Sequence, residues 1–183
     1  ERGIATVARK QTLARAENRA VRRLVRAADI PELLGPPRYR FGSAETEDAE
    51  AVATAVFTTP AGGDLLPIEV STVKGTGKVT LTGSLGDVIQ ESAHAAVTYA
   101  RTHAKELGYG KTNFDKLDIH LHVPQGGLPK DGPSAGMAIV AALISALAHR
   151  KVRAGVSMTG EITLRGRVLP VDRIKEKILA AQR

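Results

Sequence analysis

Apolar residues follow two different spacings in successive segments of this chain, and the order of these segments restricts the folds that the chain can adopt. Short runs rich in β-branched residues, at 51–58, 65–73 and 77–82, predict strands. From Ser84 to Leu107 the apolar residues recur every three or four positions instead, which predicts a helix. We expect Ser84 to cap this helix and Gly108 to end it.

The second half of the chain repeats this interleaving. It predicts, in order, a strand at 117–123, a helix at 134–149, two strands around Gly160 within 154–169, and a last helix from about Asp172. The glycine pairs Gly62-Gly63 and Gly75/Gly77 suggest hairpin-like turns between the early strands. The expected fold class is therefore mixed α/β or α+β.

The first forty residues look separate from the rest. Residues 4–28 carry apolar side chains at helical spacing among many basic ones, which predicts one helix or two short ones. Proline and glycine then interrupt the chain at Pro31 and at 35–37, so we expect a linker at about 35–42. The predicted division is a helical segment at 1–40 and a folded domain at 41–183.

Most of the positive charge lies in one terminal segment. Residues 1–26 hold eight Lys or Arg against two Glu, which accounts for +6 of the formal charge of +7. Such a basic helix can be a solvated or partner-facing surface, and it can also contact DNA phosphates without reading the sequence. Both interpretations stay open. Aromatic residues make up only 3% of the chain, so platforms for stacking single-stranded bases are few.

The composition also excludes some chemistry. The chain has no cysteine, so disulfides, thiolate catalysis and Cys-ligated zinc are ruled out. Its longest apolar run, Met137 to Ala148, is shorter than the roughly 20 residues that cross a bilayer. The first ten residues contain no apolar signal-peptide core. We expect a cytoplasmic chain with no membrane contact.

One serine is surrounded by small residues between a predicted strand and a predicted helix. Ser134 lies in Pro129-Lys130-Asp131-Gly132-Pro133-Ser134-Ala135-Gly136, where unpaired backbone N–H groups at a helix start could stabilise an oxyanion. It is a candidate nucleophile. The simpler alternative is a serine that only caps the helix.

A serine nucleophile needs a base, and a lysine is one candidate. On a helical wheel Lys177 falls on the arc of Ile178, Ala180 and Ala181, whereas Lys175 and Glu176 point away. A desolvated lysine can be neutral and act as a base, but a lysine stem can also lie on apolar surface while its ammonium reaches water.

The histidines offer a different base or a metal site. His120 and His122 share one face of the strand expected at 117–123 and could begin a metal site. No third ligand has a characteristic spacing, so polar strand residues are the simpler interpretation, and we expect no metal.

Several long segments resemble one known family. In order and spacing, the proteolytic domain of the Lon family of ATP-dependent serine proteases is closely similar to GGDLLPIEV, GKVTLTGSLGDVIQESAHAA, DIHLHVP, PKDGPSAGMA, and MTGEITLRGRVLP followed by IKEKILAA. The similarity spans about residues 41–183. It implies a serine endopeptidase in which Ser134 is the nucleophile and Lys177 its dyad partner. It also marks Thr159 as the hydrogen-bond partner of the lysine, with Asp131, His120, His122 and Glu161 around the site.

The resemblance carries further expectations about the whole protein. Residues 1–40 look like the end of the α-helical lid of an ATPase module, which would bind ATP and Mg²⁺ outside this chain. We expect no cofactor in the chain itself. The resemblance implies a homohexameric ring that degrades misfolded, damaged and regulatory proteins.

Two features depart from the family pattern. Members commonly have Gly-Gly where this chain has Asp172-Arg173, and they continue with further strands and a helix after the position of Arg183, so we expect a truncated domain. Lys74-Gly75-Thr76-Gly77-Lys78 resembles a phosphate-binding loop, but Val79 replaces the Ser or Thr that such a loop needs. A turn explains this segment better.

Two alternatives to a peptidase remain. The chain could be a catalytically silent DNA- or partner-binding module that acts through residues 1–26. It could also be an α/β domain of another enzyme family, in which Ser134 merely caps a helix.

Overall fold

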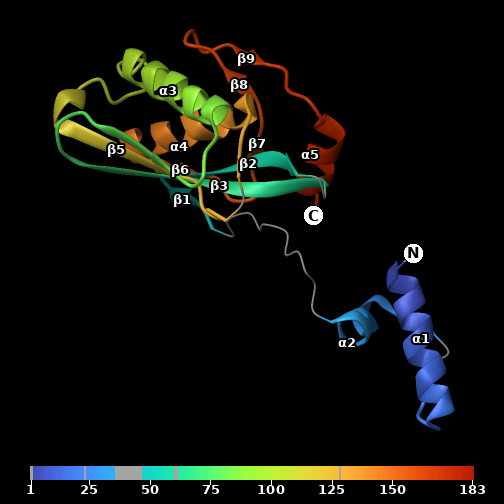
Figure 1. Cartoon of the computed structure of the whole chain (residues 1–183). Helices are drawn as coiled ribbons and strands as arrows, with labels where there is room; N and C mark the ends of the chain where they lie inside the picture. Colours follow the sequence, from blue (N-terminus) through green and yellow to red (C-terminus); the bar gives the residue numbers. More distant parts are fainter. Residues whose placement is uncertain (1, 23, 36–46, 60–61, 128) are drawn as a thin grey trace. The chain divides into compact units, whose positions relative to one another are not determined.

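The structure, a computed structural model, describes residues 2–22, 24–35, 47–59, 62–127 and 129–183. The chain divides into two compact units, Glu1–Arg40 and Phe41–Arg183 (Figure 1). The expected linker at 35–42 lies, from residue 36 onward, outside the described residues. That the first unit is the end of an ATPase lid stays a prediction.

The first unit contains helix α1 (Arg2–Ala16), a 3₁₀ turn η1 (Ala27–Asp29) and helix α2 (Ile30–Leu34). The pattern at 4–28 predicted one helix or two short ones, and among the described residues of this range only 4–16 are α-helical. Asn18 adopts a left-handed conformation (φ 55°), which asparagine tolerates better than most residues and which ends the helix. Within the described part of the chain, no helix is long and apolar enough to cross a membrane.

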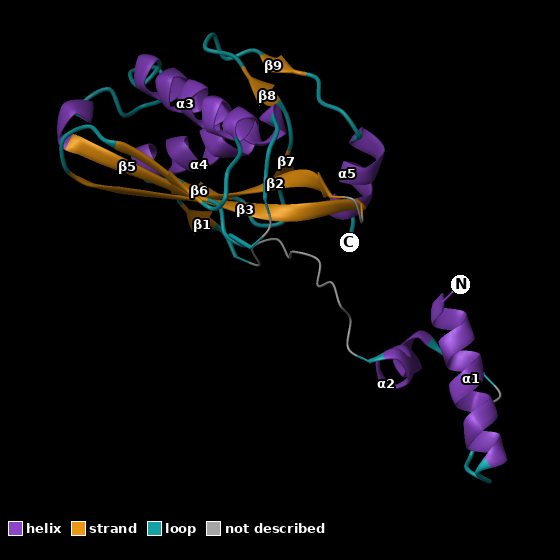
Figure 2. Ribbon diagram, viewed as in Figure 1, coloured by secondary structure: helices purple, strands orange, loops and turns teal. Residues whose placement is uncertain are grey.

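The second unit is built on a five-stranded mixed sheet in the order β4-β5-β3-β2-β7 (Figure 2). These strands are β2 (Val52–Thr59), β3 (Gly62–Lys74), β4 (Val79–Thr82), β5 (Leu117–His122) and β7 (Ser157–Met158). Two small pairs accompany it: β1 (Ala49–Glu50) with β6 (Lys151–Val152), and β8 (Glu161–Ile162) with β9 (Val168–Leu169). The mixed α/β fold class is confirmed.

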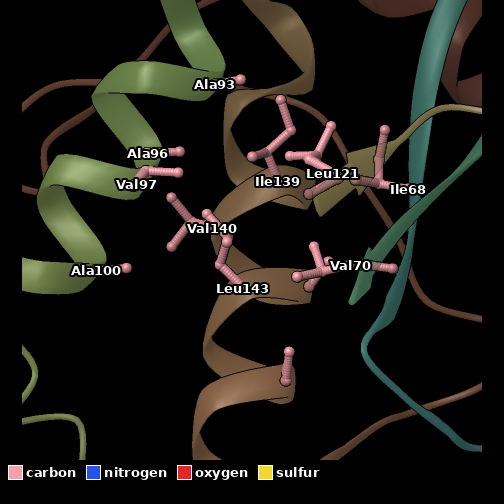
Figure 3. Close-up of a cluster of buried hydrophobic side chains, with 14 of the residues drawn as sticks. Ile68, Val70, Ala93, Ala96, Val97, Ala100, Leu121, Ile139, Val140 and Leu143 are labelled. Carbon is pink, nitrogen blue, oxygen red and sulfur yellow. The ribbon is translucent and has the colours of Figure 1, made fainter. Parts of the chain in front are cut away.

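Two helices cover one face of this sheet. They are α3 (Asp87–Thr102) and α4 (Gly136–Ala148), and each is preceded in the chain by a strand of the sheet. Figure 3 shows α3 and α4 in contact with each other and with the strands through small and branched apolar side chains. The labelled members are Ile68, Val70, Ala93, Ala96, Val97, Ala100, Leu121, Ile139, Val140 and Leu143. The alanine-rich face of α3 allows the two helices to approach closely.

The last helix, α5 (Ile174–Ala181), packs against β3 and β2 (Figure 1). Its Ala180 forms a small separate cluster with Val56 and Leu65. The neighbours of these two strand residues, Ala55 and Leu66, belong to the main core. Since successive side chains of a strand point to opposite faces, α5 covers the face of the β2–β3 hairpin opposite to α3 and α4.

Four predictions about helix ends, a turn and a strand count are wrong. Ser84 does not cap α3, because the helix begins at Asp87 after Gly86, and α3 ends at Thr102 rather than near Gly108. The turn at Gly75–Gly77 is not a hairpin turn, because β5 lies between β3 and β4. The region 154–169 contains three short strands rather than two, since β7 joins the large sheet while β8 and β9 pair with each other.

Candidate active site

Ser134 lies in the 3₁₀ turn η3 (Pro133–Ala135), directly before α4. It is half-buried and lines a cavity of about 230 Å³. The cavity is lined by Phe57, Thr58, Thr59, Leu66, Ile89, Pro129, Lys130, Asp131, Gly132, Ser134 and Ala135. A hydroxyl therefore faces a small space in which apolar and charged side chains meet.

The hydroxyl of Ser134 does not cap a helix. The N-cap of α4 is Ala135 and that of η3 is Gly132, and neither turn has a side-chain capping hydrogen bond. The interpretation of Ser134 as only a capping residue is therefore wrong. Its Oγ is left available for chemistry.

Lys177 is buried on α5. Only 4% of its surface is exposed, whereas Lys175 and Glu176 on the same helix are exposed. Burial lowers the pKa of the Lys177 ammonium below its usual 10.5, and the nearby Asp172 carboxylate partly opposes this change. Ile178 and Ala181, which the helical wheel placed on the same arc, are exposed, so Ala180 is its buried companion.

Ser134 and Lys177 lie against the same β-hairpin. The Ser134 cavity is lined by residues 57–59 of β2, and α5 packs on Val56 of β2 and Leu65 of β3. No hydrogen bond joins the Oγ of Ser134 to the Nζ of Lys177 in the structure, and Lys177 Nζ makes no hydrogen bond or ion pair with any residue that the structure describes. The lysine is therefore buried without a hydrogen bond or a close ion pair, and Asp172 acts on its charge only at longer range.

The segment between β7 and β8 is hydrogen-bonded to the main chain of Ser134. Gly160 N–H donates to the carbonyl oxygen of Ser134 at 2.9 Å, and Met137 N–H donates to the carbonyl of Gly160 at 3.1 Å. The hydroxyl of Thr159 also donates to the Ser134 carbonyl, at 3.3 Å, rather than to Lys177. The expected role of Thr159 as partner of the lysine stays a prediction.

Asp131 lines the cavity, and its side chain accepts hydrogen bonds from the backbone there. Its Oδ1 accepts hydrogen bonds from the amides of Ile89 (3.1 Å) and Gly132 (2.8 Å). Ile89 is in the first turn of α3, so Asp131 supplies the cap that was expected from Ser84.

The other three candidates lie outside the Ser134 cavity. Glu161 lines a neighbouring cleft together with Pro133 and Ser92. His120 Nε2 and His122 Nδ1 both form hydrogen bonds with Thr82 Oγ1, at 2.9 and 2.7 Å, on the sheet. Among the described residues, no three His, Asp or Glu side chains gather as metal ligands.

The segment that resembles a phosphate-binding loop already holds an anionic group of the protein. Asp118 Oδ1 accepts hydrogen bonds from the amides of Thr76 (2.7 Å) and Lys78 (2.8 Å). These hydrogen bonds lower the pKa of the Asp118 carboxylate, and the bond from Lys78 has the largest effect. The turn is therefore filled by a carboxylate, where a nucleotide-binding loop would hold a phosphate.

Comparison with known proteins decides the family. Residues 24–183 match the family described as Lon protease (S16) C-terminal proteolytic domain. The chain belongs to this family. It is 54% identical to Lon protease of Heliobacterium modesticaldum over 183 residues, which is 100% of this chain and 22% of that protein.

Other Lon proteases are similarly close. Lon protease of Desulforamulus reducens is 50% identical over 183 residues, which is 100% of this chain and 23% of that protein. Lon protease 2 of Desulfotalea psychrophila is 55% identical over 154 residues, 84% of this chain and 20% of that protein. The chain thus spans less than a quarter of the length of these relatives. The resemblance that the sequence motifs indicated is confirmed.

Sequence reasoning did not single out Lys130 or the apolar lining of the cavity. Lys130 is only 4% exposed, and Phe57, Leu66 and Ile89 come from strands and a helix far from Ser134 in the chain. The position of Lys130 inside the PKDGPSAG segment was a usable signal, but its burial depends on loops that only the folded chain brings together.

Proposed function

We propose that this Lon-family domain is a serine endopeptidase in which Ser134 is the nucleophile and Lys177 the general base. The observation that carries the proposal is the environment of Lys177, buried on α5 with a lowered pKa and without a hydrogen-bond partner among the described residues. A lysine in this state loses its proton more readily than one in water, which is the property that a base requires.

In the proposed reaction, neutral Lys177 takes the proton of the Ser134 hydroxyl as Oγ attacks the carbonyl carbon of the peptide bond. Backbone N–H groups near Ser134 stabilise the oxyanion. The ammonium of Lys177 then gives its proton to the departing amine, and the C–N bond breaks. Water, with Lys177 again as base, hydrolyses the acyl-enzyme and releases the second product.

Proton transfer requires Oγ and Nζ to come within hydrogen-bond distance, roughly 2.6–3.2 Å, or to be joined through one water. Because no hydrogen bond joins them in the structure, the proposal includes an approach of α5 and the Ser134 turn to each other when substrate binds. The Ser134 turn contacts β2 on the side of α4, whereas α5 lies on the opposite face of the hairpin, so this approach requires a rearrangement of α5 or of the turn rather than a small shift.

The whole protein would supply the rest of the process. We propose that the domain works in the cytoplasm as part of a homohexameric ring, fed with misfolded, damaged or regulatory proteins by an ATPase module that binds ATP and Mg²⁺. The chain itself would need no cofactor. Its basic segment at 1–26 would face a partner or DNA phosphates, although Arg22 there is paired with Asp29 and Glu32.

Peptide cleavage by matched variants tests the proposal. Ser134→Ala and Lys177→Met should each abolish cleavage of an unstructured fluorogenic peptide while the circular dichroism spectrum stays that of the parent chain. Two control variants should cleave at the parent rate. They are Ser71→Ala, at an exposed serine, and Lys175→Met, at an exposed lysine two residues before Lys177 in α5. Substantial turnover by either Ser134→Ala or Lys177→Met would refute the dyad.

A further inference from the structure

Lys130 is a second buried lysine, and it lines the same cavity as Ser134. Burial lowers the pKa of the Lys130 ammonium below its usual 10.5, as it does for Lys177, but the hydrogen-bond partners of the two lysines differ. The Nζ of Lys130 donates to the carbonyl oxygen of Gly83 at 2.9 Å and to that of Gln125 at 2.7 Å. An ammonium held by carbonyl oxygens keeps its proton more firmly than one without acceptors, because these hydrogen bonds favour the charged form.

The main chain of Lys130 joins the same loop. Its N–H donates to the carbonyl of Ser84 at 3.1 Å, and its carbonyl accepts from the N–H of Gly86 at 2.8 Å. The next residue, Asp131, is bonded to the first turn of α3. One residue therefore fixes two loops to each other directly before the turn that carries Ser134.

Two residues of the loops that Lys130 contacts have unfavourable backbone conformations. Ser84 (φ 55°) and Gln125 (φ 64°) are in the left-handed region, and Gly83 (φ 123°) has a positive φ that glycine adopts readily. Non-glycine residues keep such conformations only where the surrounding structure imposes them. The ammonium of Lys130, bonded to the carbonyls of Gly83 and Gln125, contributes to this constraint together with the hydroxyl of Ser84, which donates to the carbonyl of Gly126.

We propose that Lys130 is a positioning residue for the nucleophile: its charged ammonium clamps the loops at Gly83 and Gln125 and so fixes the turn that presents Ser134 to substrate. Lys130 and Lys177 thus have different tasks, one as a hydrogen-bond donor to two carbonyl groups and the other as a base. This inference rests on the proposed peptidase function.

The absence of cysteine from the chain permits a direct test of the charge. Lys130→Cys is alkylated while unfolded in urea and then refolded, with 2-bromoethylamine to restore a lysine-like ammonium or with iodoacetamide to give a neutral side chain. Lys177→Cys is treated in the same way, and the parent chain passes through the same steps. Lys130→Met is also compared with Lys111→Met, a control substitution at an exposed lysine.

We expect Lys130→Met and the neutral adduct at position 130 to lower kcat for peptide cleavage by about a hundredfold, as misplacement of a reacting group by about 1 Å does, with little change in KM. The aminoethyl adduct should restore kcat. Its pH–rate profile should keep the acid limb of the parent chain, whereas aminoethylated Lys177→Cys should shift that limb downward, because the sulfur makes the amine less basic.

Parent kcat in Lys130→Met, or in the neutral adduct, would overturn the inference. A shifted acid limb in the aminoethyl adduct at position 130 would also overturn it, since Lys130 would then be the base itself. Hydrogen exchange separates this inference from the peptidase proposal. The amides of Gly86 and Lys130 should exchange faster in Lys130→Met whether or not the chain cleaves peptides, and unchanged exchange would contradict the clamp.

Discussion

The hydroxyl of Thr159 donates a hydrogen bond to the main-chain carbonyl of Ser134, 3.3 Å away and 25 residues earlier in the chain. The amide of Gly160 donates to the same oxygen. The segment between β7 and β8 is therefore attached to the carbonyl group of the candidate nucleophile, so changes at Thr159 act on Ser134.

Thr159→Val should lower the free energy of unfolding by about 0.5–1.5 kcal/mol, the usual net value of one hydrogen bond. The Gly160 bond remains, so the fold should persist. If Thr159 acts through Ser134, kcat should fall without a shift of the pH–rate profile, and Thr159→Ser should restore it. A shifted acid limb in Thr159→Val would instead show that the threonine acts on Lys177.

Asp131 provides a second test of how the turn before Ser134 is held. Asp131→Ala removes the acceptor of the Ile89 and Gly132 amides, so it should lower the stability of the domain by about 1 kcal/mol, as loss of a helix cap does. Asp131→Asn keeps an amide oxygen and should cost less. Urea unfolding of the two variants measures the difference, and equal stability of Asp131→Ala and the parent chain would contradict the capping role.

The strands, the helices and the position of Ser134 could be predicted because each depends on local period and turn chemistry. The cap of α3 could not be predicted, since Asp131 reaches it from 42 residues away. The strand order also escaped prediction, because β5 separates β3 from β4 although those two strands are consecutive in the sequence. For Lys177 the wheel correctly identified the buried lysine and its buried neighbour Ala180, but Ile178 and Ala181 on the same arc are exposed, because α5 touches the hairpin with a narrow stripe.

The burial of Lys177 should make stability depend on pH. Its pKa is lowered in the folded state, so the unfolded chain binds more protons between that lowered value and 10.5. The parent chain should therefore gain stability relative to Lys177→Met as pH rises through this window. At neutral pH Lys177→Met should be the more stable of the two, because the parent chain must either bury the ammonium or release the proton that Lys177 binds in the unfolded chain.

Urea unfolding at pH 7 and at pH 10 checks this prediction. Lys175→Met, at an exposed position of the same helix, is the matched control and should show no such dependence. A stability difference between the parent chain and Lys177→Met that stays constant over this pH range would mean that the ammonium of Lys177 is solvated.

The packing of α5 against the sheet depends on Gly63 of β3. A Cβ at Gly63 would lie 2.1 Å from the carbonyl oxygen of Glu176 and 2.7 Å from its carbonyl carbon, so the backbone of α5 must move to accommodate it. Gly63→Ala should lower the free energy of unfolding by roughly 1–3 kcal/mol. It should also reduce peptide cleavage, because Lys177 moves with the helix.

Gly127→Ala is the control for this substitution, since a Cβ at Gly127 would meet nothing within 4 Å and its backbone is not left-handed. It should leave stability and cleavage close to those of the parent chain. If Gly63→Ala behaved like Gly127→Ala, the packing of α5 on β3 would not be as tight as the structure indicates.

The reactivity of one hydroxyl tests the central claim most directly. The chain is treated with a fluorophosphonate, and the modified residue is mapped by mass spectrometry as a function of time, in the parent chain and in Lys177→Met. We predict one adduct, on Ser134, whose rate of formation falls sharply in Lys177→Met and is unchanged in Lys175→Met. An adduct on another residue, or equal rates in the parent chain and Lys177→Met, would contradict the assignment of Ser134 as nucleophile and Lys177 as its base.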